Sequence, residues 1–183
     1  MTHSGWHFEE SWTEYQNNYF GVERHSVRPP KGTLTDYFRV TFGDGVVGLC
    51  VVDGAIPFVK LYRPRLDESL LELPGGGIHN DEEPAEAVRR EFREETGYSA
   101  TTVEHLGSYY FTAWSQAKRH FFWLDGIEAV EPDGKEREIQ DVIHVPVDKA
   151  LARLTTDPAA EWNGLALLAA ANEGYVDLAA VQG

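Results

Sequence analysis

The sequence predicts an α/β fold in which a mixed β-sheet lies between helices. Three observations support this fold: segments rich in β-branched and aromatic residues fill the first part of the chain, one segment has a helical period, and the last part is rich in alanine and leucine. The length of 183 residues suits one domain with a sizeable core and a small accessory element.

The accessory element is expected at residues 1–43. Residues 19–25 alternate loosely between apolar and polar side chains, and residues 35–42 are rich in aromatic and β-branched side chains, so both segments favour strands. The Pro-Pro-Lys-Gly sequence at residues 29–32 predicts a turn between them. Residues 44–183 would then form the main domain.

The main sheet is expected to begin with a β-hairpin. Residues 46–52 and 56–62 are largely apolar, and the dipeptide Asp53-Gly54 between them is a strong signal for a two-residue turn. Cys50 lies in the first run and is expected to be a buried core thiol. The patterns that follow predict strands over residues 69–73, 99–112, 120–124 and 142–145, and helices over residues 148–154 and 159–171.

A further helix is expected over residues 81–96, between the first strands and the later ones. Asp81 is of a type that caps helix N-termini, and Pro84 is tolerated only in a first turn. Gly97 stands where a helix-ending residue belongs.

Three acidic residues share one face of this helix. Glu91, Glu94 and Glu95 are spaced i, i+3 and i+4, which brings their carboxylates within one turn of each other. An apolar stripe about 100° further round can pack on the sheet while the acids point into a cleft. A solvated helix face is the ordinary alternative. Hard oxygen ligands without histidine or thiolate suit Mg²⁺ or Mn²⁺ rather than zinc, and Arg90 is placed to orient the carboxylates.

The segment that includes these acids resembles the Nudix box, whose pattern is G-x5-E-x7-R-E-U-x-E-E-x-G-U with U an apolar residue. The matching residues are Gly76, Glu82, Arg90, Glu91, Phe92, Glu94, Glu95, Gly97 and Tyr98. At average residue usage, such a match arises by chance in a chain of this length with a probability below about 10⁻⁶. The full pattern therefore favours metal binding over a solvated helix face.

The resemblance implies the Nudix fold, an α/β/α sandwich, and Mg²⁺-dependent or Mn²⁺-dependent hydrolysis of a nucleoside diphosphate linked to another moiety. By position, the Gly75 carbonyl, Glu91 and Glu95 would ligate the metal, and Glu94 would be a ligand or a bridge. Such a metal cluster would neutralise the diphosphate and activate a water molecule.

Further catalytic positions are implied by the same resemblance. Arg90 would orient the carboxylates, and Glu82 would be a cap that stabilises the loop and the start of the helix. The family usually has an acidic pair in a loop ahead of the last sheet strand, and Glu136 and Glu138 stand there. Glu138 is the stronger candidate for a catalytic base or a further metal ligand.

More of the chain resembles the ADP-ribose pyrophosphatase branch of this family. Those proteins have a small N-terminal strand domain, a strand ending in a tyrosine-arginine pair, and Glu-Leu-Pro before the glycines. Leu61-Tyr62-Arg63 and Glu72-Leu73-Pro74 stand in those places. Arg63 would contact a phosphate or ribose of the substrate, with Arg65 as the second candidate.

One departure from this branch concerns substrate choice. Many members have a proline about sixteen residues after the box, whereas residues 111–115 here read Phe-Thr-Ala-Trp-Ser. Trp114, or Tyr19 and Phe20 from the N-terminal strands, would stack on a base. Because members of this branch are commonly dimeric, a homodimer is expected, in which a neighbouring subunit supplies the latter pair.

Composition excludes several other functions. Thirty acidic and sixteen basic residues give a formal charge of −14, which disfavours binding to a nucleic acid polymer or an anionic membrane surface. The apolar run at residues 46–52 is far too short to cross a bilayer. The N-terminus lacks a basic region followed by an apolar one, so a cytoplasmic location is expected.

Three functions are weighed. The first is a pyrophosphohydrolase that cleaves ADP-ribose or a similar nucleoside diphosphate sugar to a nucleoside monophosphate and a sugar phosphate. The second is a non-catalytic Nudix-like module that senses nucleotides, although a pure sensor has no need of three metal-binding carboxylates. The third, an acidic scaffold for a basic protein, leaves the glycines and the ordered acids unexplained.

Overall fold

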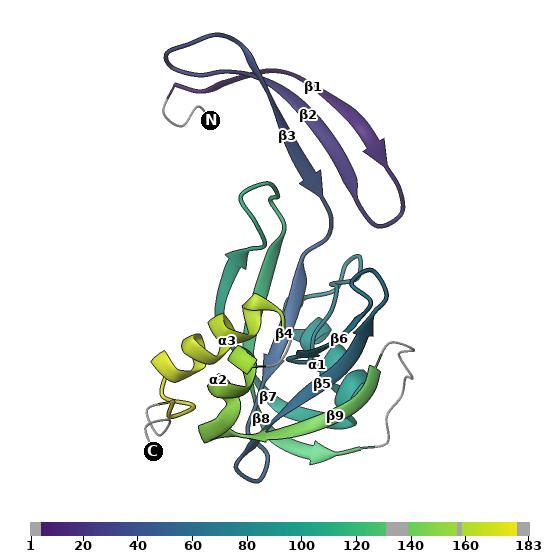
Figure 1. Cartoon of the computed structure of the whole chain (residues 1–183), viewed down its shortest axis with the longest axis vertical. Helices are drawn as coiled ribbons and strands as arrows, with labels where there is room; N and C mark the ends of the chain where they lie inside the picture. The colour runs from purple at the N-terminus through teal and green to yellow at the C-terminus, as the bar shows by residue number, and fades with distance from the viewer. Residues whose placement is uncertain (1–4, 131–138, 157–158, 179–183) are drawn as a thin grey trace. The chain divides into compact units, whose positions relative to one another are not determined.

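A computed structural model gives the fold and describes residues 5–130, 139–156 and 159–178 (Figure 1). The chain divides into two compact units. Unit 1 comprises Met1–Asp44 and Tyr109–Lys118, and unit 2 comprises Gly45–Ser108 and Arg119–Gly183. The expected N-terminal element, residues 1–43, lies within unit 1, which also takes in the turn between two later strands.

Unit 1 contains an antiparallel sheet of three strands, β1 (His7–Gln16), β2 (Gly21–Arg28) and β3 (Thr35–Thr41), in that order. Strand β1 was not predicted from the sequence, because all ten of its residues are exposed and no buried alternation marks it. Residues 109–118 join this unit through a hydrogen bond from the Val40 N–H to the Trp114 carbonyl at 2.8 Å.

Unit 2 has two three-stranded sheets that together contain parallel and antiparallel pairs. One has the order β4 (Gly45–Leu49), β8 (Lys118–Ala129), β7 (Tyr98–Tyr110), with β4 parallel to β8. The other has the order β6 (Glu68–Glu72), β5 (Ala55–Arg63), β9 (Ile139–Pro146), with both pairs antiparallel.

The predicted hairpin of residues 46–52 and 56–62 is wrong, although its turn is present. Asp53 and Gly54 both have positive φ angles, 50° and 78°, as a type I′ turn requires. Only Val52 and Ala55 form a bridge across it, and β4 and β5 then enter different sheets. Both strands are largely buried, so their apolar sequences suit interior positions beside other partners equally well.

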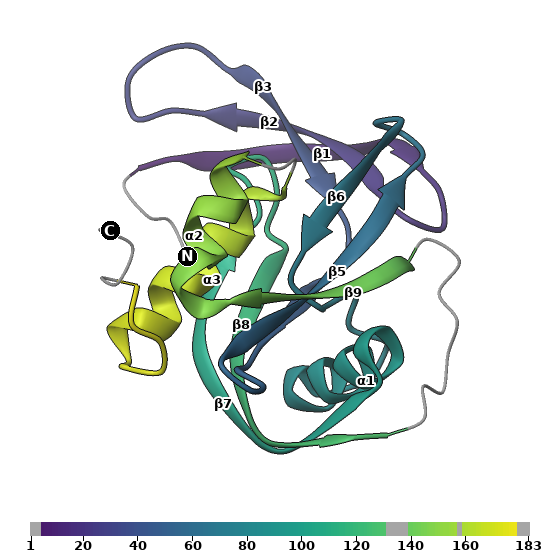
Figure 2. The same cartoon turned by 60° about the horizontal axis from the view of Figure 1, so that its bottom comes forward.

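The helices of unit 2 cover both sides of its strands (Figure 2). Helix α1 (Pro84–Thr96) packs Val88 and Phe92 against a cluster that includes Val46, Cys50 and Leu124. Helices α2 (Val147–Thr156) and α3 (Glu161–Asn172) pack on a second cluster that includes Leu49, Phe58 and Phe121. This arrangement confirms the α/β class and the expected sandwich of a mixed sheet between helices.

In the part of the chain that the structure describes, no helix combines the length and the apolar character needed to span a bilayer.

Candidate active site

The loop between β6 and α1 lies directly on strand β4. The N–H groups of Gly48 and Val46 donate to the carbonyls of Pro74 and Gly76, at 2.8 and 2.9 Å. A Cβ atom on Gly75 would overlap the Val46 carbonyl oxygen, so only glycine allows this approach. The loop is therefore fixed on β4 through its backbone.

This pairing determines where the Gly75 peptide groups point. In an extended chain, successive residues direct their N–H and C=O groups to opposite sides. Because the Pro74 and Gly76 carbonyls face β4, Gly75 faces away, and its N–H donates to Glu95 Oε2 at 2.7 Å. The Gly75 N–H consequently lies on the side of α1 that carries the acidic residues.

Helix α1 begins three residues later than the sequence pattern predicts. The N-cap is Glu83, which makes no capping bond with its side chain, and Pro84 occupies the first turn. Asp81 is not the cap, because its φ angle of 64° places it in a left-handed turn ahead of the helix. The predicted end is confirmed: Gly97 has a φ angle of 71° and donates to the Arg93 carbonyl.

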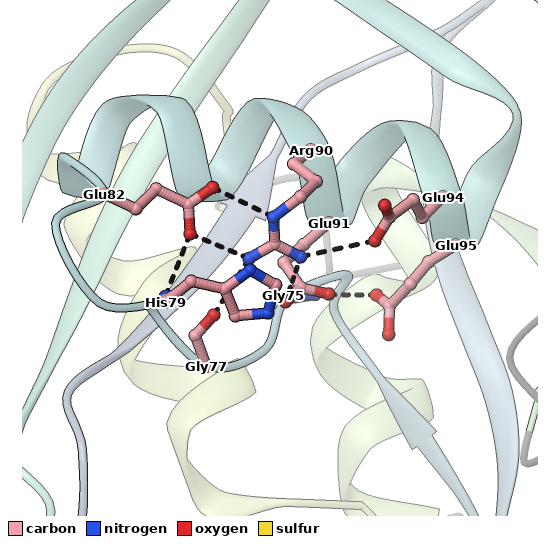
Figure 3. A network of polar contacts seen from close by, with 8 residues as sticks. All are labelled: Gly75, Gly77, His79, Glu82, Arg90, Glu91, Glu94 and Glu95. Atoms are coloured by element: carbon pink, nitrogen blue, oxygen red, sulfur yellow. Dashed lines mark hydrogen bonds and ion pairs between the residues drawn. The ribbon is translucent and has the colours of Figure 1, made fainter. Parts of the chain in front are cut away.

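The carboxylates of Glu91, Glu94 and Glu95 project from one face of α1, as the spacing predicts (Figure 3). Glu91 and Glu95 are only 5% and 7% exposed, whereas Glu94 is partly exposed. A Cβ on Gly76 would lie 2.5 Å from Glu91 Oε1, so the second glycine leaves room for this carboxylate. The glycine loop and the acidic face are thus packed as one site.

Arg90 connects these acids to the loop. Its guanidinium donates to Glu91 Oε1 at 2.8 Å, to Glu94 Oε2 at 3.3 Å and to the Gly77 carbonyl at 3.1 Å. It also makes two bonds of 2.9 Å to Glu82. The bonds to Glu82 and Glu91 raise the Arg90 pKa above its ordinary value. Arg90 is therefore always positively charged, and the acids around it are negatively charged.

Glu82 holds the loop rather than capping the helix. Its Oε2 accepts the His79 N–H at 3.0 Å while both oxygens bind Arg90. Arg90 first, and the His79 N–H second, lower the Glu82 pKa to about 2. Glu82 is therefore charged at neutral pH and ties the loop to α1. The resemblance implied that Glu82 stabilises the loop and the helix start as a cap, but the cap position is occupied by Glu83.

The donor set suits a hard divalent cation. It consists of carboxylate oxygens and a backbone carbonyl, the ligands that Mg²⁺ and Mn²⁺ prefer. Within the described ranges, no three acidic, histidine or cysteine side chains converge on one point. Glu95 accepts the Gly75 N–H, and Glu91 and Glu94 accept from Arg90, each through one carboxylate oxygen.

The structure brings Arg63 and Arg65 together at a pocket of about 560 Å³. The residues that line it are Arg63, Pro64, Arg65, Leu66, Leu70, Glu72 and Trp162. Arg63 binds the buried carboxylate of Glu72 at 2.6 and 3.2 Å. In the described part of the chain, Arg65 makes no ion pair. Among the residues that the structure describes, the pocket therefore offers one cation without an ion pair, Arg65, and one oriented cation, Arg63, beside an apolar wall.

Sequence reasoning missed two residues of this pocket, Glu72 as a partner and Trp162 as a wall. The ring of Trp162 lies 3.5 Å from the guanidinium of Arg119. Trp162 comes from α3, about one hundred residues after Arg63, so no local pattern near Arg63 indicates it. Only the tertiary fold brings Trp162 to the pocket.

The remaining predicted site residues are not among the described residues of unit 2. Trp114 and Tyr19 belong to unit 1, where their side chains are 67% and 81% exposed, and base stacking by them stays a prediction. Glu136 and Glu138 lie outside the described residues, so their roles also stay predictions.

Comparison with known proteins identifies relatives over most of the chain. The family model described as NUDIX domain matches residues 43–167. ADP-ribose pyrophosphatase of Bacillus subtilis (strain 168) is 30% identical over 129 residues, which are 68% of this chain and 70% of that protein. Methanol dehydrogenase activator of Bacillus methanolicus is 30% identical over 152 residues, 79% and 82% of the two chains.

Two further similarities concern a hydrolase sequence and a solved fold. CMP-5'-(N-acetyl-N-hydroxy-3-aminopropyl)phosphonate hydrolase of Streptomyces rubellomurinus (strain ATCC 31215) is 31% identical over 132 residues, 70% of this chain and 57% of that protein. A crystal structure of an ADP compounds hydrolase has a TM-score of 0.83 and 20% identity, covering 96% of this chain and 100% of that one. The latter similarity supports the fold alone.

Proposed function

This chain belongs to the NUDIX family and is a Nudix hydrolase of the ADP-ribose pyrophosphatase-like branch, and from this we propose that it hydrolyses ADP-ribose or a related nucleoside diphosphate sugar. Water would add to one phosphorus while the bridging oxygen leaves with the other. The products would be a nucleoside monophosphate and a sugar phosphate. The observation that carries the proposal is the acidic face of α1 packed against the Gly75 loop.

We propose Mg²⁺ or Mn²⁺ as the cofactor, held by Glu91, Glu94, Glu95 and the Gly75 carbonyl. A bound divalent cation would neutralise the diphosphate and lower the pKa of a water molecule. The hard oxygen donors support this assignment, as does the space that Gly76 leaves for Glu91.

The chain's own residues would prepare this site in two ways. Arg90 holds Glu91 and Glu94 on the same side of α1, and Glu82 holds Arg90 in turn. This arrangement offsets the repulsion among acids that are within one turn of each other. Glu95 and Gly75 set the distance between the helix and the loop. We propose Glu138 as the catalytic base or as a further metal ligand.

The arginine pocket would bind the substrate's phosphates. Arg65 makes no ion pair among the described residues, so its charge is available to an anion. Arg63 is fixed in orientation by Glu72 and can present its remaining N–H groups to a phosphate or ribose. We also propose Trp114 or Tyr19 as the stacking partner of the base.

The test is product release from a panel of substrates. The panel contains ADP-ribose, ADP-glucose, GDP-mannose, NADH, diadenosine polyphosphates and nucleoside triphosphates, each with Mg²⁺ or Mn²⁺ and with Glu95→Gln as the blank. We expect metal-dependent cleavage of a nucleoside diphosphate sugar. Absence of turnover across the panel, with ligand binding still detectable, would favour the nucleotide sensor instead.

We also propose that the protein is a homodimer formed through unit 1. The sheet of unit 1 exposes large aromatic side chains, among them Phe8, Tyr37 and Phe38, which favours contact with another surface. Light scattering is expected to return twice the chain mass of 20.6 kDa, and a monomer would reject the proposal.

A further inference from the structure

Asn163, in the first turn of α3, is completely buried and hydrogen-bonded to strand β6 and the residue after it. Its Oδ1 accepts the Leu73 N–H at 2.9 Å, and its Nδ2 donates to the Leu71 carbonyl at 2.9 Å. A backbone N–H can only donate and a carbonyl can only accept, so these partners fix the orientation of the amide. One side chain thus holds two backbone groups of one segment.

These two backbone groups lie on the side of an edge strand that faces away from β5. In the order β6, β5, β9, strand β6 is at the edge, and besides β5 the described residues give it only an isolated parallel bridge between Leu71 and Ala159. Asn163 supplies both a donor and an acceptor to the other side, as a neighbouring strand would. Its amide therefore fixes the backbone where β6 ends and the loop to α1 begins.

The residue between the two bonded groups belongs to the arginine pocket. Glu72 stands between Leu71 and Leu73, and its carboxylate binds Arg63 at 2.6 Å. Because the backbone on both sides of Glu72 is held, the position of this carboxylate is set, and with it the direction of Arg63. The adjacent residue of α3, Trp162, lines the same pocket.

The other end of the held segment leads to the acidic face of α1. Leu73 precedes Pro74, whose carbonyl accepts the Gly48 N–H, and then Gly75, whose N–H binds Glu95. Asn163 holds this segment at Leu71 and Leu73, and β4 holds it at Pro74 and Gly76. The placement of the Gly75 carbonyl relative to Glu95 depends on both.

Packing alone does not account for an asparagine at this position. Asparagine is a weaker helix former than alanine or leucine, which occupy most of the neighbouring positions of α3. Burying an amide without partners is costly, so an apolar residue would fill the space more readily. Asparagine instead provides a hydrogen-bond donor and an acceptor next to each other on one short side chain.

We propose that Asn163 is a positioning residue that sets both halves of the active site through the backbone of residues 71–73. It acts on Arg63 through Glu72 and on the metal-binding residues through Gly75. This inference rests on the proposed function, because it assigns the held segment to substrate and metal binding.

The experiment compares Asn163→Asp and Asn163→Ala with Leu167→Ala. The aspartate variant keeps the acceptor for Leu73 but, when ionised, loses the donor to Leu71, at almost unchanged size. Leu167 is buried in the same helix and contributes only apolar packing, so its truncation is a control for lost stability. Each protein is measured for its melting temperature, for Mn²⁺ binding by calorimetry without substrate, and for KM and kcat.

We expect both Asn163 variants to weaken Mn²⁺ binding and to raise KM, each by about tenfold, as loss of an indirect support does in other metal sites. Leu167→Ala is expected to melt earlier than the wild type yet to keep its Mn²⁺ affinity and KM within about twofold. If Asn163→Ala fails to fold, the Mn²⁺ affinity and the KM of the isosteric Asn163→Asp variant test the proposal.

Two negative results have different meanings. Asn163 variants that lose stability but keep wild-type Mn²⁺ affinity and KM would overturn the positioning role and leave the proposed function intact. A folded wild-type protein that neither binds Mn²⁺ nor turns over any diphosphate sugar would overturn the proposed function itself.

Discussion

The acidic face of α1 and the arginine pocket beside β6 are built alike but with opposite charge. On α1, one cation, Arg90, lies among the carboxylates of Glu82, Glu91 and Glu94. In the pocket, one buried carboxylate, Glu72, holds Arg63. Each site therefore carries an excess of one sign around a central partner of the other sign.

The difference indicates which ligand each site can receive. Excess carboxylate attracts a cation, and excess arginine attracts phosphate, so the two sites together suit a metal-bound diphosphate. They are joined by a short stretch of chain, because Glu72 belongs to the pocket and Gly75 to the acidic site. The charge of each site can be changed by substitution without changing the other site.

The largest effect is expected from removing one charge at the acidic site. Glu95→Gln should lower kcat by about 10²- to 10⁴-fold, because several kcal/mol of charge stabilisation through the metal would be lost. Steady-state kinetics with Mg²⁺ measure this change. Glu86→Gln, on an exposed part of the same helix, is the matched control and should keep its turnover.

The second effect concerns the arginine pocket and separates its two cations. Arg65→Ala should raise KM by about tenfold without loss of stability, since Arg65 has no ion pair among the described residues. Arg63→Ala should raise KM similarly and also lower the free energy of unfolding by about 1–3 kcal/mol, because Glu72 stays buried without this partner.

Substrate titrations and urea unfolding of both variants test this separation. Lys60→Ala, at an exposed position of the same strand β5, is the control. Equal loss of stability in both arginine variants would contradict the central role of Glu72.

A third, smaller effect is expected in the glycine loop. Gly76→Ala would place its Cβ 2.5 Å from the Glu91 carboxylate, so the acid must move and Mn²⁺ affinity should fall about tenfold. Gly77→Ala meets nothing within 4 Å and has no positive φ angle, so it should bind Mn²⁺ like the wild type. Calorimetric titration of both variants compares them, and equal affinities would show that Gly76 does not make room for Glu91.

The effect that is smallest at neutral pH concerns the apolar cluster beneath α1, which contains Cys50. Burial raises the pKa of the Cys50 thiol to about 12, from an ordinary value of 9.0. Below pH 9 the thiol is neutral in both the folded and unfolded states and adds no pH dependence. Above pH 9 the Cys50 thiol loses its proton in the unfolded state but keeps it in the folded state. The free energy of unfolding should therefore fall by about 1.4 kcal/mol per pH unit up to about pH 12.

Urea unfolding between pH 8 and 11, compared with Cys50→Ala, isolates this contribution. Alkylation by iodoacetamide at pH 8 should be negligible in the folded protein and rapid after unfolding. Rapid alkylation of the folded protein would mean that the cluster is open to solvent.

The acidic site could be predicted from the sequence because its main contacts are local. Glu91, Glu94 and Glu95 lie within one turn, so the helical period alone places them on one face. The link from Glu82 to Arg90 is also short in sequence, but the structure shows this bond and it was not predicted from the sequence. The start of α1 was mispredicted because Asp81 is a good capping residue that the chain uses in a left-handed turn instead.

The arginine pocket and the sheet order could not be predicted in the same way. Trp162 and Asn163 reach β6 from the C-terminal helix, and nothing near Arg63 in the sequence indicates their presence. The hairpin error has a related cause, since the apolar runs around Asp53-Gly54 do not specify their partners. Exposed β1 had no buried alternation to mark it.

The composition of unit 1 has a consequence for how this protein can be shortened. Residues 109–118 belong to unit 1 although they connect two strands of unit 2, and Phe111 packs edge-on against Phe42. Deleting residues 1–44 would strip the Phe111 ring of this cover and leave the Trp114 carbonyl without the Val40 N–H. The N-terminal strands therefore cannot be deleted without other changes. A truncated enzyme would need a redesigned turn between β7 and β8.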